Sequence, residues 1–484
     1  MSGASILEGI ERVHMLGIGG IGVSAVARLL HERGFVVSGS DVRASALTDE
    51  VAKLGMTVRI GHDRANLDGV DFVVRSTAIP EHNVELVAAR ALGIPVAHRS
   101  EVLNDLLRGY RSIGVTGTHG KGTVSSMITC ILEAAGWEPG FVIGGRLENF
   151  GINARDTGGE WMVVEVDESD GTHLNFELDY VVCNFLELDH LNYYEDLDDI
   201  VANMHRLMVD TPGLKEVFLN LDCAGNRRLA AQLPLRPTGY AVDHATEYQG
   251  RFTSADQLPL RFEALRRGEK LSDVELDLPG RYNVVNAMGA VAVAHRIGVP
   301  VEAIARGLGM YRGLENRFTI QTGGGVTIVK DYNSHPTCMR KVLRSARDLV
   351  DGRIISIFKP YRYTLIKYLQ DEYGAAFAGS DEVVITTMYA ADEDPIPGVD
   401  TELVVQKIRD NGLKVTFIPN QEDINDYLLS WVRPGDKAIF FGGDDFFRMA
   451  DRFTARLAQR AGEAPAALTT GDVGGPRGAG DDEA

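Results

Sequence analysis

The sequence predicts an α/β protein built from three consecutive domains. The chain has 484 residues, and domains of about 100 to 200 residues are usual, so three are expected. Apolar strands alternate with helical segments along most of the chain, which is typical of parallel βαβ units. Glycine-rich turns at residues 17–22 and 117–122 each follow an apolar strand and precede a helical segment, as phosphate-binding turns do.

The composition of the chain argues against several classes of protein. Hydrophobic residues make up 44 % of the chain and charged residues 24 %, which is ordinary for globular proteins. The net charge of −19 and the lack of any Lys/Arg-rich run argue against nucleic-acid binding. The 4 cysteines are far apart and form no CxxC pair, so we expect neither disulfides nor a zinc site, and we expect a reducing cytoplasm as the location. The apolar run 13–30 contains glycines and charged residues, so no membrane insertion is predicted.

The first domain is predicted over residues 1–110. The stretch RVHML at 12–16, a glycine turn, a helix closed by Gly34 and the stretch FVVSGSD at 35–41 form a βαβ unit. Further strands are expected at 57–59 and 70–76, with a helix at 84–92.

The second and third domains are predicted over 111–318 and 319–461. The second has strands at 112–117, 161–167 and 180–186 and helices at 283–297 and 301–308. The third has strands at 326–332, 354–360, 382–388, 413–419 and 437–443, with a helix at 337–350. Residues 462–484 are acidic, aperiodic and rich in Gly, Ala and Pro, so a disordered tail is expected there.

The first glycine turn matches the pattern GxGxxG through Gly17, Gly19, Gly20 and Gly22, and Asp41 ends the following strand. Unpaired N–H groups and the dipole at the start of a helix favour an anion such as phosphate. By itself the motif is also compatible with a dinucleotide dehydrogenase, or with a turn that merely packs strand on helix.

The second glycine turn resembles a general phosphate-binding loop but departs from it in two places. Val115 stands where the first glycine would be, and Gly122 stands where the metal-binding hydroxyl would be, which moves that hydroxyl to Thr123. The loop residues expected to hold phosphate are Gly117, Thr118, Gly120, Lys121, Gly122 and Thr123.

Two candidate metal ligands follow predicted strands of the second domain. Glu165 lies in VVEVDESD and His190 lies in NFLELDH. Open α/β sheets hold their ligands at the carboxyl ends of the strands, and Mg²⁺ prefers oxygen ligands shared with phosphates. The alternative is that either residue has only a structural role. This alternative is less favoured because both residues follow a phosphate loop.

The motifs TGTHGK, EVDESD, ELDHLNYY, LPGRYNVVNA, GLENRF and DYNSHP occur in this order after GIGGIG and VSGSD. Over about residues 10–460 the chain resembles the Mur ligases, and most closely their alanine-adding branch. This resemblance implies a Rossmann-like N-terminal domain that binds a UDP-linked substrate, a central ATPase-like domain with a phosphate loop, and a Rossmann-like C-terminal domain that closes over ATP and the amine. It implies an ADP-forming ligase of the cytoplasm that uses ATP and Mg²⁺ in peptidoglycan synthesis, as a monomer or homodimer.

The resemblance also implies roles for individual residues. For ATP and catalysis it implies Lys121 and Arg317 at the phosphates, Asn283 and Asn286 at the adenine side, Asp331 at the nucleotide, and Thr123, Glu165 and His190 at Mg²⁺. For the uridine diphosphate it implies Gly17, Gly19, Gly20, Gly22, Asp41, Ser76 and Thr77.

The expected amine site departs from the alanine-adding pattern. That branch has DYGHHP and PHRYTR, whereas this chain has DYNSHP at 331–336 and PYRYTL at 360–365. Ser334, Tyr361 and Leu365 replace two histidines and an arginine, while His335 and Arg362 remain. The function expected from the resemblance is ligation of UDP-N-acetylmuramate to L-alanine. A paralogue that joins a different amine or acid, and a non-catalytic nucleotide-binding scaffold, are the alternatives.

Overall fold

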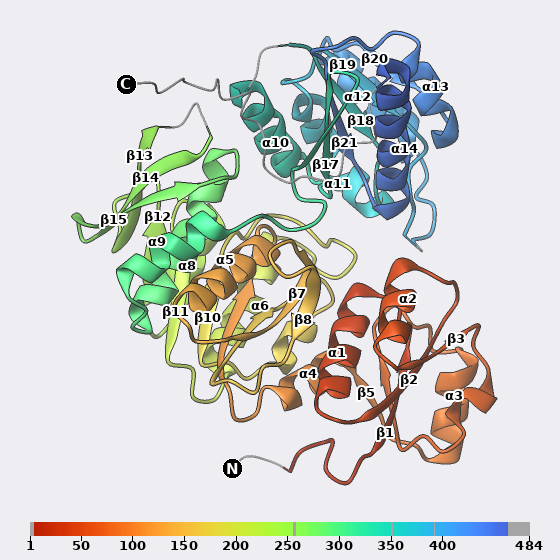
Figure 1. The fold of residues 1–484 in the computed structure, drawn as a ribbon, viewed down its shortest axis with the longest axis vertical. Coiled ribbons are helices and arrows are strands. Elements are labelled where there is room, and N and C mark those ends of the chain that lie inside the picture. Colours follow the sequence, from red (N-terminus) through yellow and green to blue (C-terminus); the bar gives the residue numbers. More distant parts are fainter. Residues whose placement is uncertain (1–3, 255–257, 350–351, 392, 463–484) are drawn as a thin grey trace, which may run out of the picture. The chain divides into compact units, whose positions relative to one another are not determined.

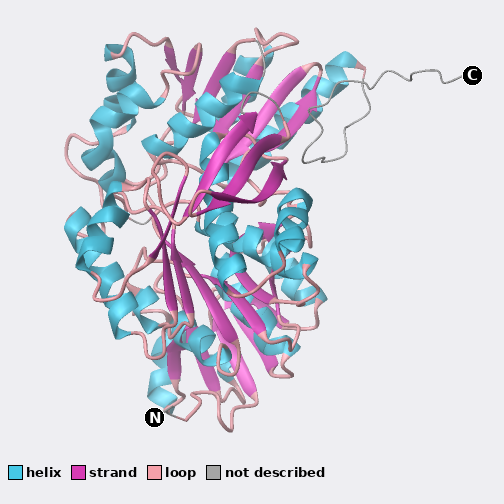
Figure 2. Ribbon diagram, turned by 90° about the vertical axis from the view of Figure 1, so that its left-hand side faces the viewer, coloured by secondary structure: helices cyan, strands magenta, loops and turns pink. Residues whose placement is uncertain are grey.

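The computed structural model describes residues 4–254, 258–349, 352–391 and 393–462 (Figure 1). The chain forms two compact units, the first comprising 1–251, 264–273 and 285–311 and the second 252–263, 274–284 and 312–484. Three parallel-rich sheets follow one another along the sequence, and helices flank their strands (Figure 2), so the predicted α/β fold class is confirmed. The exact domain boundaries stay predictions, and the tail expected at 462–484 lies outside the described residues except for Gly462, which caps α14.

The first sheet has the strand order β3-β2-β1-β4-β5, and all of its neighbouring strands are parallel. Its strands are β1 (Arg12–Leu16), β2 (Val36–Asp41), β3 (Thr57–Ile60), β4 (Phe72–Arg75) and β5 (Val96–His98). Its helices are α1 (Ile21–Glu32), α2 (Ala46–Lys53), η1 (Arg64–Leu67), α3 (Val84–Leu92) and α4 (Arg99–Leu106). Asn83 caps α3 by accepting from the N–H groups of Glu85 and Leu86, and Gly93 ends it in the left-handed conformation.

The central sheet has the order β15-β14-β13-β12-β11-β10-β6-β9-β7-β8. Its strands are β6 (Arg111–Thr116), β7 (Gly140–Leu147), β8 (Ile152–Arg155), β9 (Trp161–Glu165), β10 (Tyr180–Cys183), β11 (Glu216–Asn220), β12 (Thr238–Ala241), β13 (Tyr248–Ser254), β14 (Leu260–Arg266) and β15 (Glu269–Leu276). The helices along this stretch are α5 (Lys121–Ala134), η2 (Thr172–Asn175), α6 (Leu197–Asp210), α7 (Ala224–Gln232), α8 (Arg281–Arg296) and α9 (Val301–Met310). Strands β6 and β10 are parallel neighbours, which brings their carboxyl ends to the same edge.

The third sheet has the order β16-β17-β21-β18-β19-β20 and is parallel except for β16. Its strands are β16 (Thr319–Gly323), β17 (Val326–Asp331), β18 (Ile354–Phe358), β19 (Glu382–Ile385), β20 (Val415–Phe417) and β21 (Lys437–Phe441). Its helices are α10 (Pro336–Leu349), α11 (Tyr363–Ala376), α12 (Thr401–Asp410), η3 (Gln421–Asp423), α13 (Ile424–Leu429) and α14 (Asp444–Ala461). Strands β18 and β21 are buried along their whole length, as expected for strands covered by helices on both faces.

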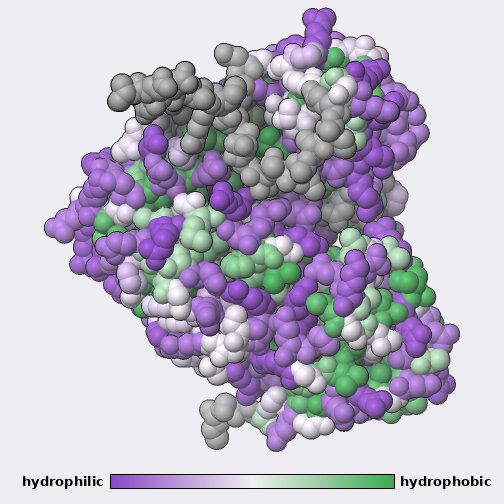
Figure 3. Space-filling view, in the orientation of Figure 1, coloured by the Kyte–Doolittle hydropathy of each residue, from purple (hydrophilic) through white to green (hydrophobic). Residues whose placement is uncertain are grey.

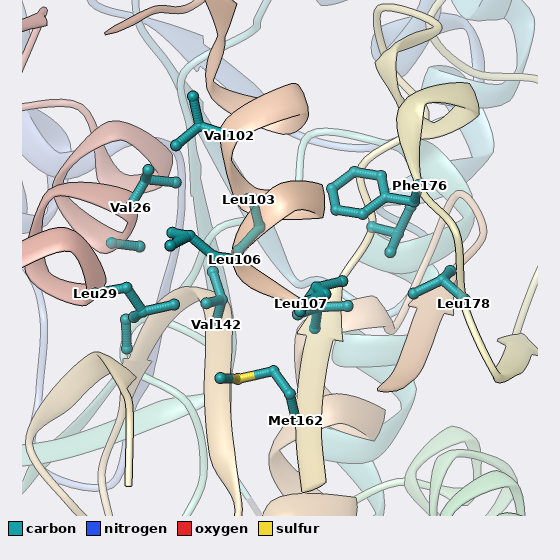
Figure 4. Packing of buried hydrophobic residues seen from close by; sticks show 14 of the residues in the cluster. Val26, Leu29, Val102, Leu103, Leu106, Leu107, Val142, Met162, Phe176 and Leu178 are labelled. Atoms are coloured by element: carbon teal, nitrogen blue, oxygen red, sulfur yellow. The ribbon is translucent and has the colours of Figure 1, made fainter. Parts of the chain in front are cut away.

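Helix α4 lies within a hydrophobic core that the first two sheets share (Figure 4). This core contains Val26 and Leu29 of α1, Leu103 and Leu106 of α4, Val142 of β7 and Met162 of β9. Two ion pairs cross the same contact, since Arg33 Nε lies 2.7 Å from Asp156 Oδ2 and Arg146 Nη2 lies 2.7 Å from Glu50 Oε2. The first two sheets are therefore packed into one unit by apolar burial and by partly buried charge pairs.

The surface is largely hydrophilic on the face shown in Figure 3, with hydrophobic side chains scattered over the first domain. Val36, Val42, Ile60 and Val84 of that domain are each more than half exposed. Single exposed aliphatic side chains are normal on proteins. Within the residues that the structure describes, no helix has both the length and the apolar character needed to cross a membrane.

Gly307 allows α9 to pack closely on α5. A Cβ built at Gly307 would lie 2.5 Å from Ile131 Cα and 2.8 Å from Cys130 O, and these backbone atoms cannot rotate away. We expect Gly307→Ala to force the helices apart and to lower the free energy of unfolding by about 1–3 kcal/mol, measured by urea denaturation. Gly309→Ala, at an exposed position of the same helix, is the control and should be neutral or stabilising by up to about 1 kcal/mol. Equal losses in both variants would contradict this explanation.

Candidate active site

The predicted phosphate loop joins β6 to α5 and requires glycine at two positions. Gly117 has φ of +111° and Gly120 has φ of +81°. A Cβ at Gly117 would lie 2.5 Å from Phe185 O, and a Cβ at Gly120 would lie 2.3 Å from Asn184 Nδ2. Because glycine stands at the N-cap of α5, no side chain caps the first turn of that helix. Such a tight loop with uncapped N–H groups fits the oxygens of a phosphate.

Lys121 begins α5, and its ammonium group is neutralised by the buried carboxylate of Glu168 and the partly exposed carboxylate of Asp167. Its Nζ lies 2.9 Å from Glu168 Oε2, 3.1 Å from Glu168 Oε1 and 3.7 Å from Asp167 Oδ1. The Glu168 side chain is 0 % exposed. Burial by itself would lower the pKa of Lys121, but Glu168, Asp167 and Glu165 raise it above its ordinary value. Burial likewise opposes ionisation of Asp167, yet Lys121 and His190 lower its pKa to about 2, so the cluster is charged at neutral pH.

His190 meets the same buried carboxylate. Its Nε2 lies 3.3 Å from Glu168 Oε1, and its Nδ1 lies 3.9 Å from Asp189 Oδ1. Burial disfavours the imidazolium, but Asp189 and Glu168 together raise the pKa of His190. The backbone of His190 has φ of +54°, a conformation that costs free energy for a residue with a side chain and is common at functional sites.

Glu165 ends β9 at the edge of the same cluster. Its Oε2 accepts a hydrogen bond of 2.6 Å from the N–H of Gly144 in β7. Thr123 lies in the first turn of α5, two residues after Lys121. Carboxylate, hydroxyl and imidazole donors fit a divalent cation chemically. The assignment of Thr123, Glu165 and His190 to Mg²⁺ nevertheless stays a prediction.

Asn184, which follows β10, connects the loop to the predicted adenine side. Its Nδ2 donates to Asn286 Oδ1 over 2.7 Å and to His119 O over 3.0 Å, and its Oδ1 accepts from the Tyr240 hydroxyl over 2.9 Å. Asn283, on the first turn of α8, is 4 % exposed and donates to Pro279 O over 2.7 Å. Asn286 is therefore tied to the loop through an asparagine that the sequence analysis did not identify.

The first glycine turn is held by strand β2. The N–H of Gly19 donates to Asp41 Oδ2 over 2.9 Å, and the N–H groups of Gly17 and Ile18 donate to the carbonyl of Ser40 over 2.8 and 3.0 Å. Gly20 is the N-cap of α1, and a Cβ at Gly19 would lie 2.9 Å from Asp41 Oδ2. Asp41 thus fixes the turn in addition to any contact with a ligand.

Residues 167–170 contact side chains that lie close to each of the two glycine turns. Thr77 Oγ1, which follows β4, donates to Asp170 Oδ2 over 2.5 Å. The Arg99 guanidinium lies 3.8 Å from Asp167 Oδ2, and a Cβ at Gly22 would lie 3.2 Å from Arg99 Nη1. Of the predicted uridine-diphosphate residues, Thr77 therefore contacts the segment that neutralises Lys121, and Gly22 lies near it through Arg99. The backbone carbonyl of Ser76 accepts from the N–H of Ile79 in the same turn.

In the second unit, Arg317 and Asp331 form a local cluster. Arg317 Nη1 donates to Tyr332 O over 3.2 Å and to Asn333 Oδ1 over 3.0 Å. Asp331 is 2 % exposed and accepts from the N–H of Phe318 over 2.9 Å. Burial raises the pKa of Asp331 to about 6, although Arg317 opposes the rise. The predicted contacts of Arg317 and Asp331 with ATP stay predictions.

Family models match the chain in three successive stretches. The Mur ligase family catalytic domain matches residues 12–111, the Mur ligase middle domain 115–294, and the Mur ligase glutamate ligase domain 316–443. The chain belongs to the Mur ligase family. Members are ATP-dependent, ADP-forming ligases, so the enzyme class predicted from the sequence is confirmed.

Curated relatives agree with this assignment. The UDP-N-acetylmuramate–L-alanine ligases of Pelotomaculum thermopropionicum and Sorangium cellulosum are 38 % and 36 % identical to this chain over 453 and 457 residues. These alignments cover 93 % of this chain and 98 % and 97 % of the relatives. The solved structure of the UDP-N-acetylmuramate–alanine ligase of Thermotoga maritima has the same fold, with a TM-score of 0.79 at 24 % identity, over 93 % of this chain and 99 % of that one.

The predicted amine residues of this Mur ligase all lie in the second unit. Arg362 has φ of +62°, and its Nη1 lies 3.7 Å from Glu393 Oε1. Tyr361 stacks on Tyr389 with ring centroids 5.9 Å apart. Leu365 is only 7 % exposed, on a face of α11 that also buries Ile366 and Leu369.

Ser334 and His335 precede α10. The Ser334 carbonyl accepts from the Tyr373 hydroxyl over 2.7 Å, and His335 Nδ1 accepts from the N–H of Thr337 over 3.2 Å. Lys359, which could replace the missing arginine, is already paired with Asp445 Oδ2 at 2.6 Å. The placement of an amine at these residues stays a prediction.

Glu168 is the site residue that sequence reasoning missed. It lies in the quoted motif EVDESD, three residues after Glu165, but only the structure shows that its side chain is the direct partner of Lys121 and His190. The sequence feature that could have identified Glu168 is the high number of carboxylates in that motif, because a buried lysine requires a counter-charge.

Replacing Glu168 tests the role of this buried pair. Glu168→Gln removes the charge beside Lys121. We therefore expect the free energy of unfolding to fall by about 3 kcal/mol and the turnover rate to fall at least about tenfold. Chemical denaturation and phosphate release measure the two effects. Glu160→Gln, which removes a surface partner of Arg111, is the control and should cost less than about 1 kcal/mol. A Glu168→Gln protein with unaltered stability would show that Lys121 does not depend on this carboxylate.

Asp331 predicts a pH dependence of stability. Its pKa is about 6 in the folded protein against an ordinary value of 3.8, so the folded state binds the proton more tightly than the unfolded state. Stability should therefore decrease by about 3 kcal/mol as the pH rises from about 4 to about 6. Denaturation of the native protein and of Asp331→Asn across this range measures the difference. Parallel pH profiles for the two proteins would contradict the assignment.

Proposed function

We propose that this Mur ligase joins L-alanine to the carboxylate of UDP-N-acetylmuramate in the cytoplasm, with ATP and Mg²⁺. The observation that carries the proposal is the segment 167–170. Asp167 and Glu168 neutralise Lys121 of the phosphate loop, while Asp170 binds Thr77 of the predicted uridine-diphosphate site. This segment supports a reaction in which a UDP-linked acid and a phosphate donor lie next to each other.

The chemistry requires an activated acid. A carboxylate is a poor acylating agent, so its oxygen attacks the γ-phosphorus of ATP, which forms an acyl phosphate and releases ADP. The amine nitrogen then attacks the acyl carbon, the C–O bond to phosphate breaks, and the amine loses a proton as the amide forms. Negative charge builds up on the transferred phosphoryl group, and Lys121 supplies fixed positive charge at the start of α5.

Mg²⁺ would be held by Glu165, His190 and Thr123, and when bound it would neutralise phosphate charge. Asp189 and Glu168 raise the pKa of His190 against the effect of burial, so a proton competes with a metal ion for this imidazole. Glu168 already contacts Lys121 and His190 and is therefore placed to orient both side chains.

A second candidate function keeps the reaction and changes the amine or the acid. The observations that favour it are Ser334, Tyr361 and Leu365, which depart from the alanine-adding pattern. An arginine–carboxylate contact is worth about 1.5–3 kcal/mol, so replacing that arginine by a buried leucine should alter recognition of the incoming carboxylate. Arg362, which faces Glu393, is the remaining arginine of that motif.

Substrate identity is tested by phosphate release from ATP and Mg²⁺ with UDP-N-acetylmuramate and each of the twenty amino acids in turn, with products confirmed by mass. We expect the largest rate with L-alanine. Lys121→Ala should reduce that rate by about 100-fold or more, because fixed positive charge at the phosphoryl group is lost. A dominant rate with another amino acid would support the second candidate. No amine-dependent release with any of the twenty would contradict the proposed pair of substrates.

A further inference from the structure

A buried carboxylate that the reaction does not use is linked to the first glycine turn through Ser40. Glu85 of α3 is 0 % exposed, although it is an acidic residue in the N-terminal domain, far along the chain from the phosphate loop. Burial of a charge without partners is costly, so its partners indicate what it does. They come from three other parts of the same domain.

The Glu85 carboxylate accepts hydrogen bonds on both oxygens. Oε2 lies 2.5 Å from Ser40 Oγ and 2.6 Å from His62 Nδ1, and Oε1 lies 2.6 Å from Asn66 Nδ2. The N–H of Asp63 reaches Oε1 at 3.3 Å, and His14 Nε2 lies 3.6 Å from the same oxygen. Burial alone would raise the pKa of Glu85, but these hydrogen bonds lower it to about 2, so Glu85 is ionised at neutral pH.

One of these partners connects Glu85 to the glycine turn. The side chain of Ser40 donates to Glu85, while its carbonyl accepts from the N–H groups of Gly17 and Ile18 at 2.8 and 3.0 Å. The next residue, Asp41, accepts from the N–H of Gly19 at 2.9 Å. The end of β2 therefore sets the conformation of the turn, and Glu85 holds the end of β2.

We propose that Glu85 is a positioning residue for the UDP-linked acid, which acts through Ser40 to fix the glycine turn that receives the diphosphate. The inference rests on the proposed function, because it assigns the turn to uridine diphosphate. Phosphate recognition by backbone N–H groups depends on their orientation. The N–H groups of Gly17 and Ile18 hold the turn on Ser40, so a small shift of these two residues displaces the N–H groups at the start of α1 and weakens binding without touching the reacting atoms. A purely structural role for Glu85 would instead lower stability and leave affinity unchanged.

The decisive variant is Glu85→Gln, which keeps the shape of the side chain but replaces one acceptor oxygen by a donor group. We expect the Kd for UDP, measured by calorimetry, and the KM for the UDP-linked acid to rise about tenfold, a free-energy change of about 1.4 kcal/mol. The KM for ATP and kcat should stay within about twofold. Glu8→Gln, a matched change at an exposed position of the same domain, should alter none of these quantities.

Ser40→Ala provides an independent test, because it removes only the Oγ atom and keeps the carbonyl that binds the turn. Ser40→Ala should raise the Kd for UDP and the KM for the UDP-linked acid, as Glu85→Gln does. If Glu85→Gln does not fold, Ser40→Ala tests the proposal by itself. Unchanged Kd for UDP in a folded variant, with only a lower melting temperature, would overturn the proposal. Native protein that binds UDP tightly without ligase activity would contradict the proposed function alone, whereas native protein without affinity for UDP would overturn this inference as well.

Discussion

The buried ion pair between Lys121 and Glu168 is the constraint on which the central site depends. Lys121 stands at the start of α5 with a side chain that is only 12 % exposed, so its ammonium group has to be neutralised by neighbouring carboxylates. Glu168 supplies the charge from the segment after β9 and also meets His190 from the segment after β10. Parallel neighbours of β6 thus deliver the groups that surround its loop.

The two glycine turns are built on the same physical plan. Each follows a parallel strand, begins a helix and is backed by a carboxylate with a fully buried side chain, Glu85 for the first and Glu168 for the second. Because α4 and its neighbours share one hydrophobic core, the two turns belong to one packed unit.

The third domain uses a different arrangement. Arg362 stands at the N-cap of α11 with a positive φ of +62°, and Glu393 accepts hydrogen bonds from the N–H and the hydroxyl of Thr364 in the same turn. Glu393 thus caps the helix and faces the arginine at once. The Arg362 guanidinium therefore lies next to a carboxylate of the protein itself.

The sequence by itself determined the fold class, the order of the domains, the two glycine turns and the family, because strand–turn–helix patterns and ordered motifs are local properties of the chain. It also predicted that Lys121, Glu165 and His190 belong to one site, and the structure brings Lys121 and His190 to the same carboxylate. It missed β5 and α4 in the first domain, and along the central stretch it missed β7, β8, β11 to β15, α6 and α7. Only the tertiary structure decided that Glu168 is the partner of Lys121, that Leu365 is buried, and that Glu85 supports Ser40. Those contacts join residues that are far apart along the chain or lie on different faces of one segment, and side-chain direction there is set by packing rather than by local pattern.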